Sequence, residues 1–290
     1  MIGFASWGMR SELSRLWQIC FEEPARPADF FLNNFFSPRN CLVYRVGETV
    51  AAAVHLLPAR VVSKNGAVRA HYVYAAATLP QYRGRGYMAS LLACAAMEGA
   101  RRGDRYSVVL PADEGLYGLY EKSGYTRFFR VRNLSVGAER LRTMAGDKTS
   151  PKTLFDFRRL SLLRNSLLGQ NIGSVLWNEK MVWFAAGMGS VYGDRLVCSR
   201  TGNAFAYALC RPSDGFCAVL EAMADKEAFA GLAASLLREA PAPEYRFRLP
   251  VSGLFPGEGK PSAFGMIKPI GGSALEEIRS DAPYLGLSLD

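Results

Sequence analysis

The chain has 290 residues, of which 49% are hydrophobic and 21% are charged, so it can bury a substantial core and is long enough for two domains. This composition argues against disorder, and no apolar run approaches the roughly 18 residues of a membrane span. The formal net charge of +9 favours an anionic partner. Because the basic residues are dispersed, a polyanionic small molecule fits this charge at least as well as nucleic acid.

The amino terminus and the cysteines indicate the cellular compartment of the protein. Residues 1–15 mix Arg10, Glu12 and Arg15 among apolar residues, without the continuous apolar segment of a secretion signal. The six cysteines lack the C-x-x-C spacing of zinc or redox sites. We therefore expect a cytoplasmic protein with reduced thiols, no metal and no contact with a membrane. The cysteines are Cys20, Cys41, Cys94, Cys198, Cys210 and Cys217.

Helix and strand patterns alternate along the first 136 residues. Apolar residues at helical spacing predict helices, and the Gly47-Glu48 and Asn65-Gly66 pairs predict hairpin turns between strands. The predicted elements are helices at 8–21 and 27–36, strands at 41–46, 50–57 and 72–78, a helix at 87–102, a strand at 106–110, a helix at 115–122 and a strand at 125–136.

The second half repeats this order without a glycine-rich turn between a strand and a helix. Residues 137–152 are polar and aperiodic, so we predict a linker there, between a domain over 1–136 and a degenerate copy over 153–290. The predicted fold class is α/β (α+β). The predicted elements are helices at 157–168 and 225–238 and strands at 191–199, 204–211, 217–220, 244–249 and 263–268.

Residues 78–88 are the most informative segment, because they connect a predicted strand to a predicted helix. A helix amino terminus carries unpaired N–H groups and the positive end of the helix dipole, so it attracts phosphate. Gly84 and Gly86 place no side chain between these donors and a bound pyrophosphate. Arg83 and Arg85 add positive charge beside it. The turn therefore predicts a pyrophosphate site.

Two motifs in this half resemble those of the GNAT acyltransferases. Gln81-x-x-Gly84-x-Gly86 matches the family signature (Arg/Gln)-x-x-Gly-x-(Gly/Ala), and the string Leu-Tyr-Glu-Lys-Ser-Gly-Tyr over residues 119–125 resembles the second family motif. The second motif follows after one helix and one strand, as in the family. The tandem layout, with Leu-Pro-Ala-Asp before the second motif, is similar to acetyltransferases of the enhanced intracellular survival type.

This resemblance implies two GNAT-like domains, each with a mixed, mostly antiparallel twisted sheet flanked by helices, of which the second is degenerate. It implies acetyl-CoA as co-substrate, held in an opening between the strands at 72–79 and 106–110. Tyr120 matches the family's general acid, which protonates the leaving thiolate. The cofactor-binding residues implied are Ala77, Thr78, Leu79, Gln81, Arg83, Gly84, Arg85, Gly86, Tyr87 and Met88.

A general base is harder to identify in the sequence. Many family members carry a carboxylate on the central strand, but residues 72–77 contain none. His71 and His55 are candidates, although a histidine beside a sheet is more often a structural hydrogen-bonding group. Asp113 and Glu114 are candidates for attracting a cationic substrate, with helix capping as the alternative.

One rival motif overlaps the same glycines. Gly84-x-Gly86-x-x-Ala89 also fits the dinucleotide fingerprint, and Asp104 follows Gly84 by 20 residues, where an acidic ribose ligand is expected. In a dinucleotide-binding unit that acid ends a strand, whereas Asp104 precedes the strand at 106–110. We therefore favour the acyltransferase interpretation.

The function predicted from these motifs is transfer of an acetyl group to a primary amine by direct attack in a ternary complex. The acceptor is a small molecule, an amino acid or a lysine side chain. Nucleic acid is not an expected partner, and homo-oligomerisation is left open. Two alternatives remain, a non-catalytic acyl-CoA sensor or interaction module and a tRNA-dependent aminoacyl transferase.

Overall fold

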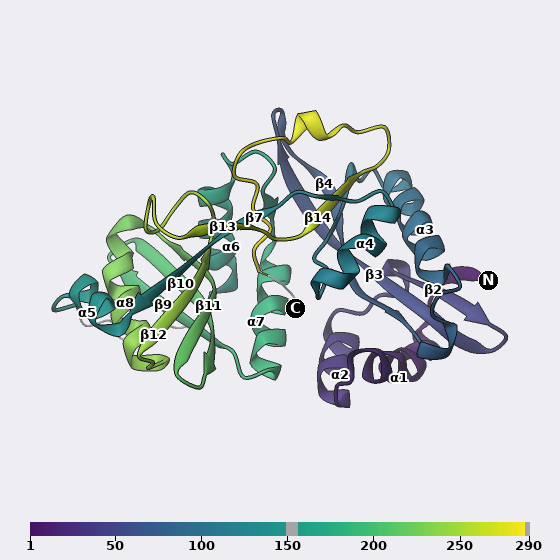
Figure 1. The fold of residues 1–290 in the computed structure, drawn as a ribbon, viewed down its shortest axis with the longest axis horizontal. Coiled ribbons are helices and arrows are strands. Elements are labelled where there is room, and N and C mark those ends of the chain that lie inside the picture. The colour runs from purple at the N-terminus through teal and green to yellow at the C-terminus, as the bar shows by residue number, and fades with distance from the viewer. Residues whose placement is uncertain (149–155, 288–290) are drawn as a thin grey trace.

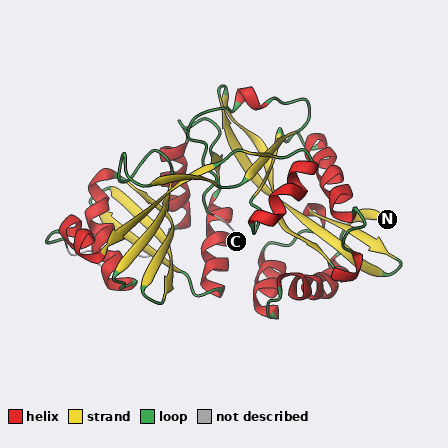
Figure 2. Ribbon diagram, in the orientation of Figure 1, coloured by secondary structure: helices red, strands yellow, loops and turns green. Residues whose placement is uncertain are grey.

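The computed structural model describes residues 1–148 and 156–287 (Figure 1). Two sheets stand next to one another, and each is flanked by helices (Figure 2). All six cysteines are free thiols. Within the described ranges, no helix is long and apolar enough to cross a lipid bilayer.

The first sheet has eight strands in the order β1-β2-β3-β4-β5-β14-β6, with β8 paired to β3. β4 and β5 are parallel, and its other strand pairs are antiparallel. Its strands are β1 (Ile2–Phe4), β2 (Cys41–Val46), β3 (Thr49–Ser63), β4 (Gly66–Thr78), β5 (Tyr106–Val109), β6 (Thr126–Arg127), β8 (Val175–Leu176) and β14 (Met266–Pro269).

The second sheet has six strands in the order β13-β7-β12-β11-β10-β9. It too contains one parallel pair, β11 with β12, among antiparallel neighbours. The predicted fold class, two mixed and mostly antiparallel sheets flanked by helices, is confirmed. The strands are β7 (Arg130–Gly137), β9 (Arg195–Thr201), β10 (Ala204–Ser213), β11 (Phe216–Ala224), β12 (Glu244–Leu249) and β13 (Lys260–Ala263).

Helices cover both faces of the first sheet. α1 and α2 pack on one face through Leu16, Trp17 and Phe31, whereas α3 and α4 pack on the other through Leu91 and Tyr120. The helices are α1 (Arg10–Phe21), α2 (Ala25–Asn34), α3 (Tyr87–Arg101), α4 (Glu114–Lys122), α5 (Ala138–Ala145), α6 (Phe157–Leu168), α7 (Glu179–Val191) and α8 (Phe229–Glu239).

The two sheets exchange strands, which the sequence did not predict. The predicted strand at 125–136 was assigned to the first sheet, but residues 130–137 form β7 in the second sheet, between β12 and β13. The first sheet takes β14 from near the carboxyl end instead, between β5 and β6. The division predicted at residue 136 therefore does not follow the division between the sheets, because strand pairing is a long-range contact.

The predicted linker at 137–152 contains a helix. Residues 138–145 form α5, whose Leu141 and Ala145 are buried in the same cluster as Leu232 and Leu236 of α8. Residues 149–152 lie outside the described part of the chain. The expectation of an aperiodic linker was wrong for α5, because its short apolar stripe gains a partner only when α8 packs against it.

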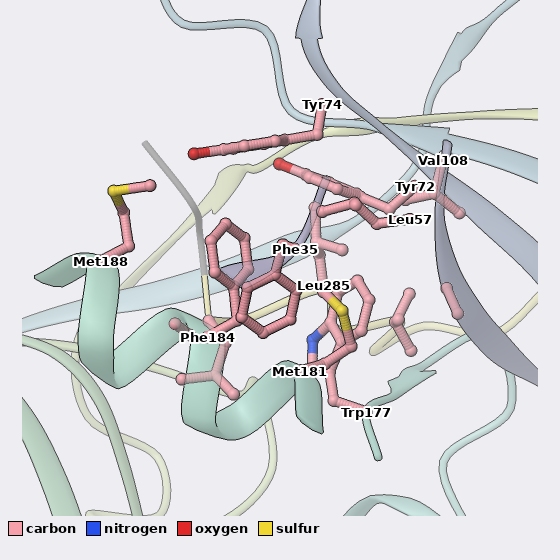
Figure 3. Close-up of a cluster of buried hydrophobic side chains, with 14 of the residues drawn as sticks. Phe35, Leu57, Tyr72, Tyr74, Val108, Trp177, Met181, Phe184, Met188 and Leu285 are labelled. Carbon is pink, nitrogen blue, oxygen red and sulfur yellow. The ribbon is translucent and has the colours of Figure 1, made fainter. Parts of the chain in front are cut away.

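Helix α7 was also not predicted. It lies between the two sheets, and its Met181, Phe184 and Met188 pack with Tyr72 and Tyr74 of β4 in one buried cluster (Figure 3). Gly187 allows the close contact with α2, because a Cβ atom there would lie 2.5 Å from the Phe30 ring. The two halves of the chain thus share a core.

A buried ion pair fastens the carboxyl-terminal segment to the second sheet. Arg164 and Glu221 are fully buried, with Nε and Oε1 3.1 Å apart. Arg164 also donates to the carbonyl oxygen of Leu285 at 2.8 Å, and Glu221 accepts the N–H of Leu287 at 3.1 Å. Since a buried charge without its partner is costly, these contacts hold residues 285–287 between the halves.

Candidate functional site

The opening in the first sheet lies where β4 and β5 stop pairing. The two strands are parallel partners from Ala70 and Tyr106 to Val73 and Val109. β5 ends at Val109, whereas β4 continues to Thr78. The last residues of β4 therefore have backbone groups on one side that β5 does not reach.

A bulge in β4 stands at the start of this opening. Tyr74 pairs with His55 of β3, but the next partner of β3 is Ala77 opposite Ala53, so two residues of β4 oppose one of β3. Ala75 takes a left-handed conformation with φ of 47°. Such a bulge re-aims the backbone, and a strained residue of this kind is more common at functional sites than elsewhere.

The glycine turn after β4 has the predicted geometry. Gly84 and Gly86 have φ angles of 75° and 76°, which suit glycine. Both are exposed, and a Cβ atom at either would meet nothing within 4 Å. Gly86 is the N-cap of α3 and provides no side-chain cap, so the first N–H groups of this 15-residue helix point into an open turn.

The two arginines of the turn have different environments. Arg83 donates from Nε to the carbonyl oxygen of Thr78 at 3.1 Å, so its side chain folds back toward β4. Arg85 is exposed, with its guanidinium 5.6 Å from the centre of the Tyr82 ring. Arg85 is therefore the better placed of the two to meet an anion at the turn.

The backbone at the end of β4 is only partly available for a ligand. Leu79 donates its N–H to Ala51 at 3.0 Å, and its carbonyl oxygen accepts the N–H of Tyr82 at 2.9 Å. Leu79 is thus not free to bind a pantetheine arm through its backbone, contrary to the sequence prediction. Because hydrogen-bonding directions alternate along an antiparallel strand, the Thr78 N–H points away from β3. The Thr78 backbone forms a hydrogen bond with the thiol of Cys20 on α1.

Tyr120 lies on α4, on the side of the sheet that α3 covers. Its side chain is 5% exposed, and its ring packs edge to face on Tyr125 with centroids 5.6 Å apart. The Tyr125 hydroxyl is in turn 2.6 Å from Ser107 Oγ on β5. Burial raises the pKa of Tyr120 to about 12, so the phenol keeps its proton at neutral pH.

Three more predicted residues lie at or near the helix start. The Met88 side chain is buried beside Leu91, Gln81 is exposed in the turn, and the Tyr87 ring stacks on Tyr44 of β2 at 3.9 Å. The Tyr44 contact was not predicted, because it depends on the pairing of β2 with β3.

His71 has a structural position. Its Nδ1 lies 3.0 Å from Asp104 Oδ2, and its ring packs so closely on α3 that a Cβ atom at Gly99 would lie 2.5 Å from it. Gly99 is near the carboxyl end of α3, roughly 18 Å along the helix from Tyr87. His71 therefore stands far from the glycine turn, in agreement with a structural role.

His55 is a core residue on the opposite face of the sheet. It is 4% exposed, its ring lies 4.6 Å from that of Phe31, and its Nε2 is 4.0 Å from Cys41 Sγ. Burial lowers the pKa of His55 to about 3, so it is uncharged at neutral pH. Neither histidine is placed to accept a proton from a substrate in the opening.

The two predicted substrate carboxylates have local partners. Asp113 is the N-cap of α4 and accepts the N–H of Leu116 at 3.1 Å. Glu114 pairs with Arg127 on the surface. Asp113 thus has the capping role that was the alternative, and Glu114 forms a surface ion pair.

Tyr72 and Tyr74 were not singled out from the sequence. Strand alternation turns both rings to the face of β4 opposite His71, where they lie beside α7 (Figure 3). Both rings lie on the side of the sheet that faces Phe184 and Met188 of α7. In the sequence they flank Val73 and precede the three alanines at 75–77, a pattern typical of a core strand, and their contact with α7 depends on the tertiary packing.

Comparison with known proteins agrees with this geometry. Residues 9–128 match the family model described as an acetyltransferase (GNAT) domain. The first half of this chain is therefore similar to GNAT acetyltransferase domains, and the predicted GNAT resemblance is confirmed. The match supports an acyltransferase. No curated protein sequence matches the chain.

Solved structures extend the similarity over the whole chain. A GCN5-related N-acetyltransferase from Anabaena variabilis has a TM-score of 0.71 at 13% identity, over 92% of this chain and 72% of the other. Eis1 from Mycobacterium abscessus has a TM-score of 0.68 at 12% identity, over 93% and 73%. A tandem GNAT protein from the clavulanic acid biosynthesis pathway has a TM-score of 0.51 at 11% identity, over 94% and 99%. At these identities the likeness is one of fold, and it supports the tandem layout.

Proposed function

We propose that this protein transfers an acetyl group from acetyl-CoA to a primary amine. The observation that carries the proposal is the open end of β4, which leads into the uncapped start of α3 at Gly86. The neutral phenol of Tyr120 lies on the side of the sheet that α3 covers. The acceptor is a small molecule, an amino acid or a lysine side chain.

The residues present fit acetyl-CoA. The turn exposes Gly84 and Gly86 and the first N–H groups of α3, which suit a pyrophosphate, and Arg85 adds a cation beside them. β5 does not reach the last residues of β4, where a pantetheine arm would add to β4 as an extra strand. Bound acetyl-CoA supplies an activated thioester and a thiol leaving group.

Two groups of the chain then have chemical roles. A backbone N–H at the end of β4 stabilises negative charge that develops on a carbonyl oxygen, and the candidate is the Thr78 N–H, which β3 does not use. Tyr120 holds a proton at neutral pH because of its raised pKa, and it donates that proton to the leaving sulfur. We propose no side chain of the chain as general base.

The acceptor approaches from the face of β4 opposite α3. Tyr72 and Tyr74 lie on this face beside α7 (Figure 3). The face is otherwise apolar and aromatic, since Phe184 and Met188 of α7 lie across from the tyrosines. We propose no nucleic acid partner.

The experiment is a thiol-release assay with acetyl-CoA and a panel of primary amines. Release of CoA that depends on an amine, with acetylated amine found by mass spectrometry, supports the proposal. Thermal stabilisation by CoA without any amine-dependent release would instead favour an acyl-CoA sensor. Absence of any stabilisation by CoA or acetyl-CoA would contradict the cofactor assignment itself.

A further inference from the structure

A second concave site lies along the edge of β3, at the junction of the two halves. β2 stops pairing with β3 at His55, and β8 pairs with it only from Arg60 onward. Among the described strands, none pairs with residues 56–59 on this edge. Pro58 has no N–H, which suits an unpaired edge.

A cavity of about 530 Å³ opens at this gap. Arg60, Arg69 and Arg102 line it from the first half, and Asn165, Trp177 and Asn178 line it from the second. Leu56 and Leu176 provide apolar wall. The volume suits a small organic molecule, and the site is built from residues far apart in the sequence.

The charge of this cavity is mainly positive. Its lining contains three arginines, from β3, from β4 and from the C-cap of α3, and a single carboxylate, Asp104. That carboxylate is shared between Arg69, whose Nε is 3.6 Å away, and His71 at 3.0 Å. α7 begins at the rim with Asn178 as its N-cap, so the positive end of a 13-residue helix adds to the potential.

The three arginines differ in how they are held. Arg102 is fixed by Glu98 and by the side chain of Asn40. Arg60 donates one N–H group to the carbonyl oxygen of Ala67, and Arg69 has 67% of its side chain exposed. Arg60 and Arg69, which are opposite each other in the β3–β4 register, are therefore the two that can turn toward a ligand.

We propose that this cavity binds a small organic anion, whose carboxylate or phosphate group pairs with Arg60 and Arg69 and whose apolar part lies against Leu176 and Trp177. Guanidinium groups recognise both kinds of anion through paired N–H donors. A solvated basic surface would explain the presence of the arginines. It does not explain their convergence on a cavity with an apolar wall.

This site is distinct from the acyl-transfer site. It lies at the Gly99 end of α3, where His71 packs, roughly 18 Å along the helix from the glycine turn. Its ligand contacts both halves of the molecule. Trp177 packs edge to face on Tyr72, with centroids 5.7 Å apart, so the cavity wall touches a residue of the acceptor face.

The test titrates the full chain with sodium succinate and with sodium phosphate at constant ionic strength. Binding is followed by calorimetry and by NMR of the histidine rings. The chain has only two histidines, of which His71 lines the cavity and His55 lies in the core. Saturable binding should shift the His71 resonances and leave those of His55 unchanged.

The variant Arg60→Ala/Arg69→Ala should weaken this binding at least about tenfold, since two charge-assisted contacts are lost. Arg15→Ala/Arg200→Ala removes the same charge from exposed positions elsewhere and should bind as the parent does.

Binding of succinate alone, phosphate alone or both identifies the anion class. Failure of both probes to bind, equal binding in the Arg60→Ala/Arg69→Ala variant, or equal loss in both variants would overturn the proposal. The His71 readout does not depend on CoA binding, so it is separate from the test of the proposed function.

Discussion

The two sheets repeat one arrangement, a single parallel strand pair that separates before its longer strand ends. In the first sheet β4 continues past Val109 of β5, and in the second β11 continues to Ala224 although its pairing with β12 ends at Val219 and Phe247. Each opening is followed by a turn and then by a helix, α3 or α8. The geometry that leaves backbone groups unpaired is therefore present twice.

The turns differ in chemistry. Gly84 and Gly86 open the first one, whereas Asp225 and Glu227 stand in the second, within a short 3-10 turn before α8. Asp225 accepts the N–H of Phe205 at 2.9 Å. A cavity of about 720 Å³ lies beside this turn, but carboxylates at its rim oppose a pyrophosphate. Strand separation is common to both sheets, so only the chemistry of the turn distinguishes them. Of the two turns, the one with Gly84 and Gly86 suits the proposed cofactor.

The strongest test of this comparison replaces Tyr120 with Phe. Loss of the hydroxyl should lower kcat about 10²- to 10⁴-fold, as expected for a lost general acid, and leave the affinity for CoA unchanged. Tyr245→Phe is the matched change in the second sheet, where the hydroxyl donates to the carbonyl oxygen of Ala240 at 3.1 Å. It should leave kcat unchanged. Equal rates for both variants would remove Tyr120 from the mechanism.

Acid should destabilise the protein through the buried His55. His55 has its pKa lowered to about 3 by burial, so below about pH 6.5 the unfolded chain takes up a proton that the folded chain does not. The free energy of unfolding should fall by up to about 1.4 kcal/mol for each pH unit from 6.5 toward 3. Urea titrations at pH 7 and pH 5 measure this slope. His55→Gln should reduce it, and an unchanged slope would contradict the assignment.

Glycine substitutions test the turn itself. Gly86→Ala forces a left-handed conformation, with φ of 76°, on a residue that disfavours it by roughly 1–2 kcal/mol, and the affinity for CoA should fall about tenfold. Gly202→Ala, at φ of 59° in the β9–β10 hairpin, imposes a similar strain far from the turn. Calorimetry should show weaker CoA binding for the first variant only. Equal affinity in both would mean that the turn does not hold the cofactor.

The smallest expected effect concerns the second opening. CoA should bind with a stoichiometry of one per chain, because the second turn has no glycine to open it; the carboxylates of Asp225 and Glu227 add only a smaller opposing charge. Asp225→Asn/Glu227→Gln should leave both the stoichiometry and the affinity as they are, since the second turn has no glycine to open it. A second CoA per chain in the parent protein would contradict the contrast between the two turns.

Local patterns in the sequence determined most of the elements and the position of the turn. The pair Gly84 and Gly86 needs left-handed angles and α3 begins after it, so the site could be found from neighbours in the chain. Hairpins such as β9–β10 follow from turn residues for the same reason. Tyr120 was assigned by motif, and its burial and raised pKa are properties of the packed structure.

Only the tertiary structure decided which strands share a sheet and which side chains reach the site. The exchange of β7 and β14, the hydrogen bond from Leu79 to Ala51, and the pairing of His71 with Asp104 all join residues distant in the chain or on neighbouring strands. Helix α7 was not predicted from the sequence because it is apolar on most sides, so it lacks the amphipathic pattern of a surface helix. Such contacts depend on the free energy of packing and not on local propensity, so composition and spacing do not specify them.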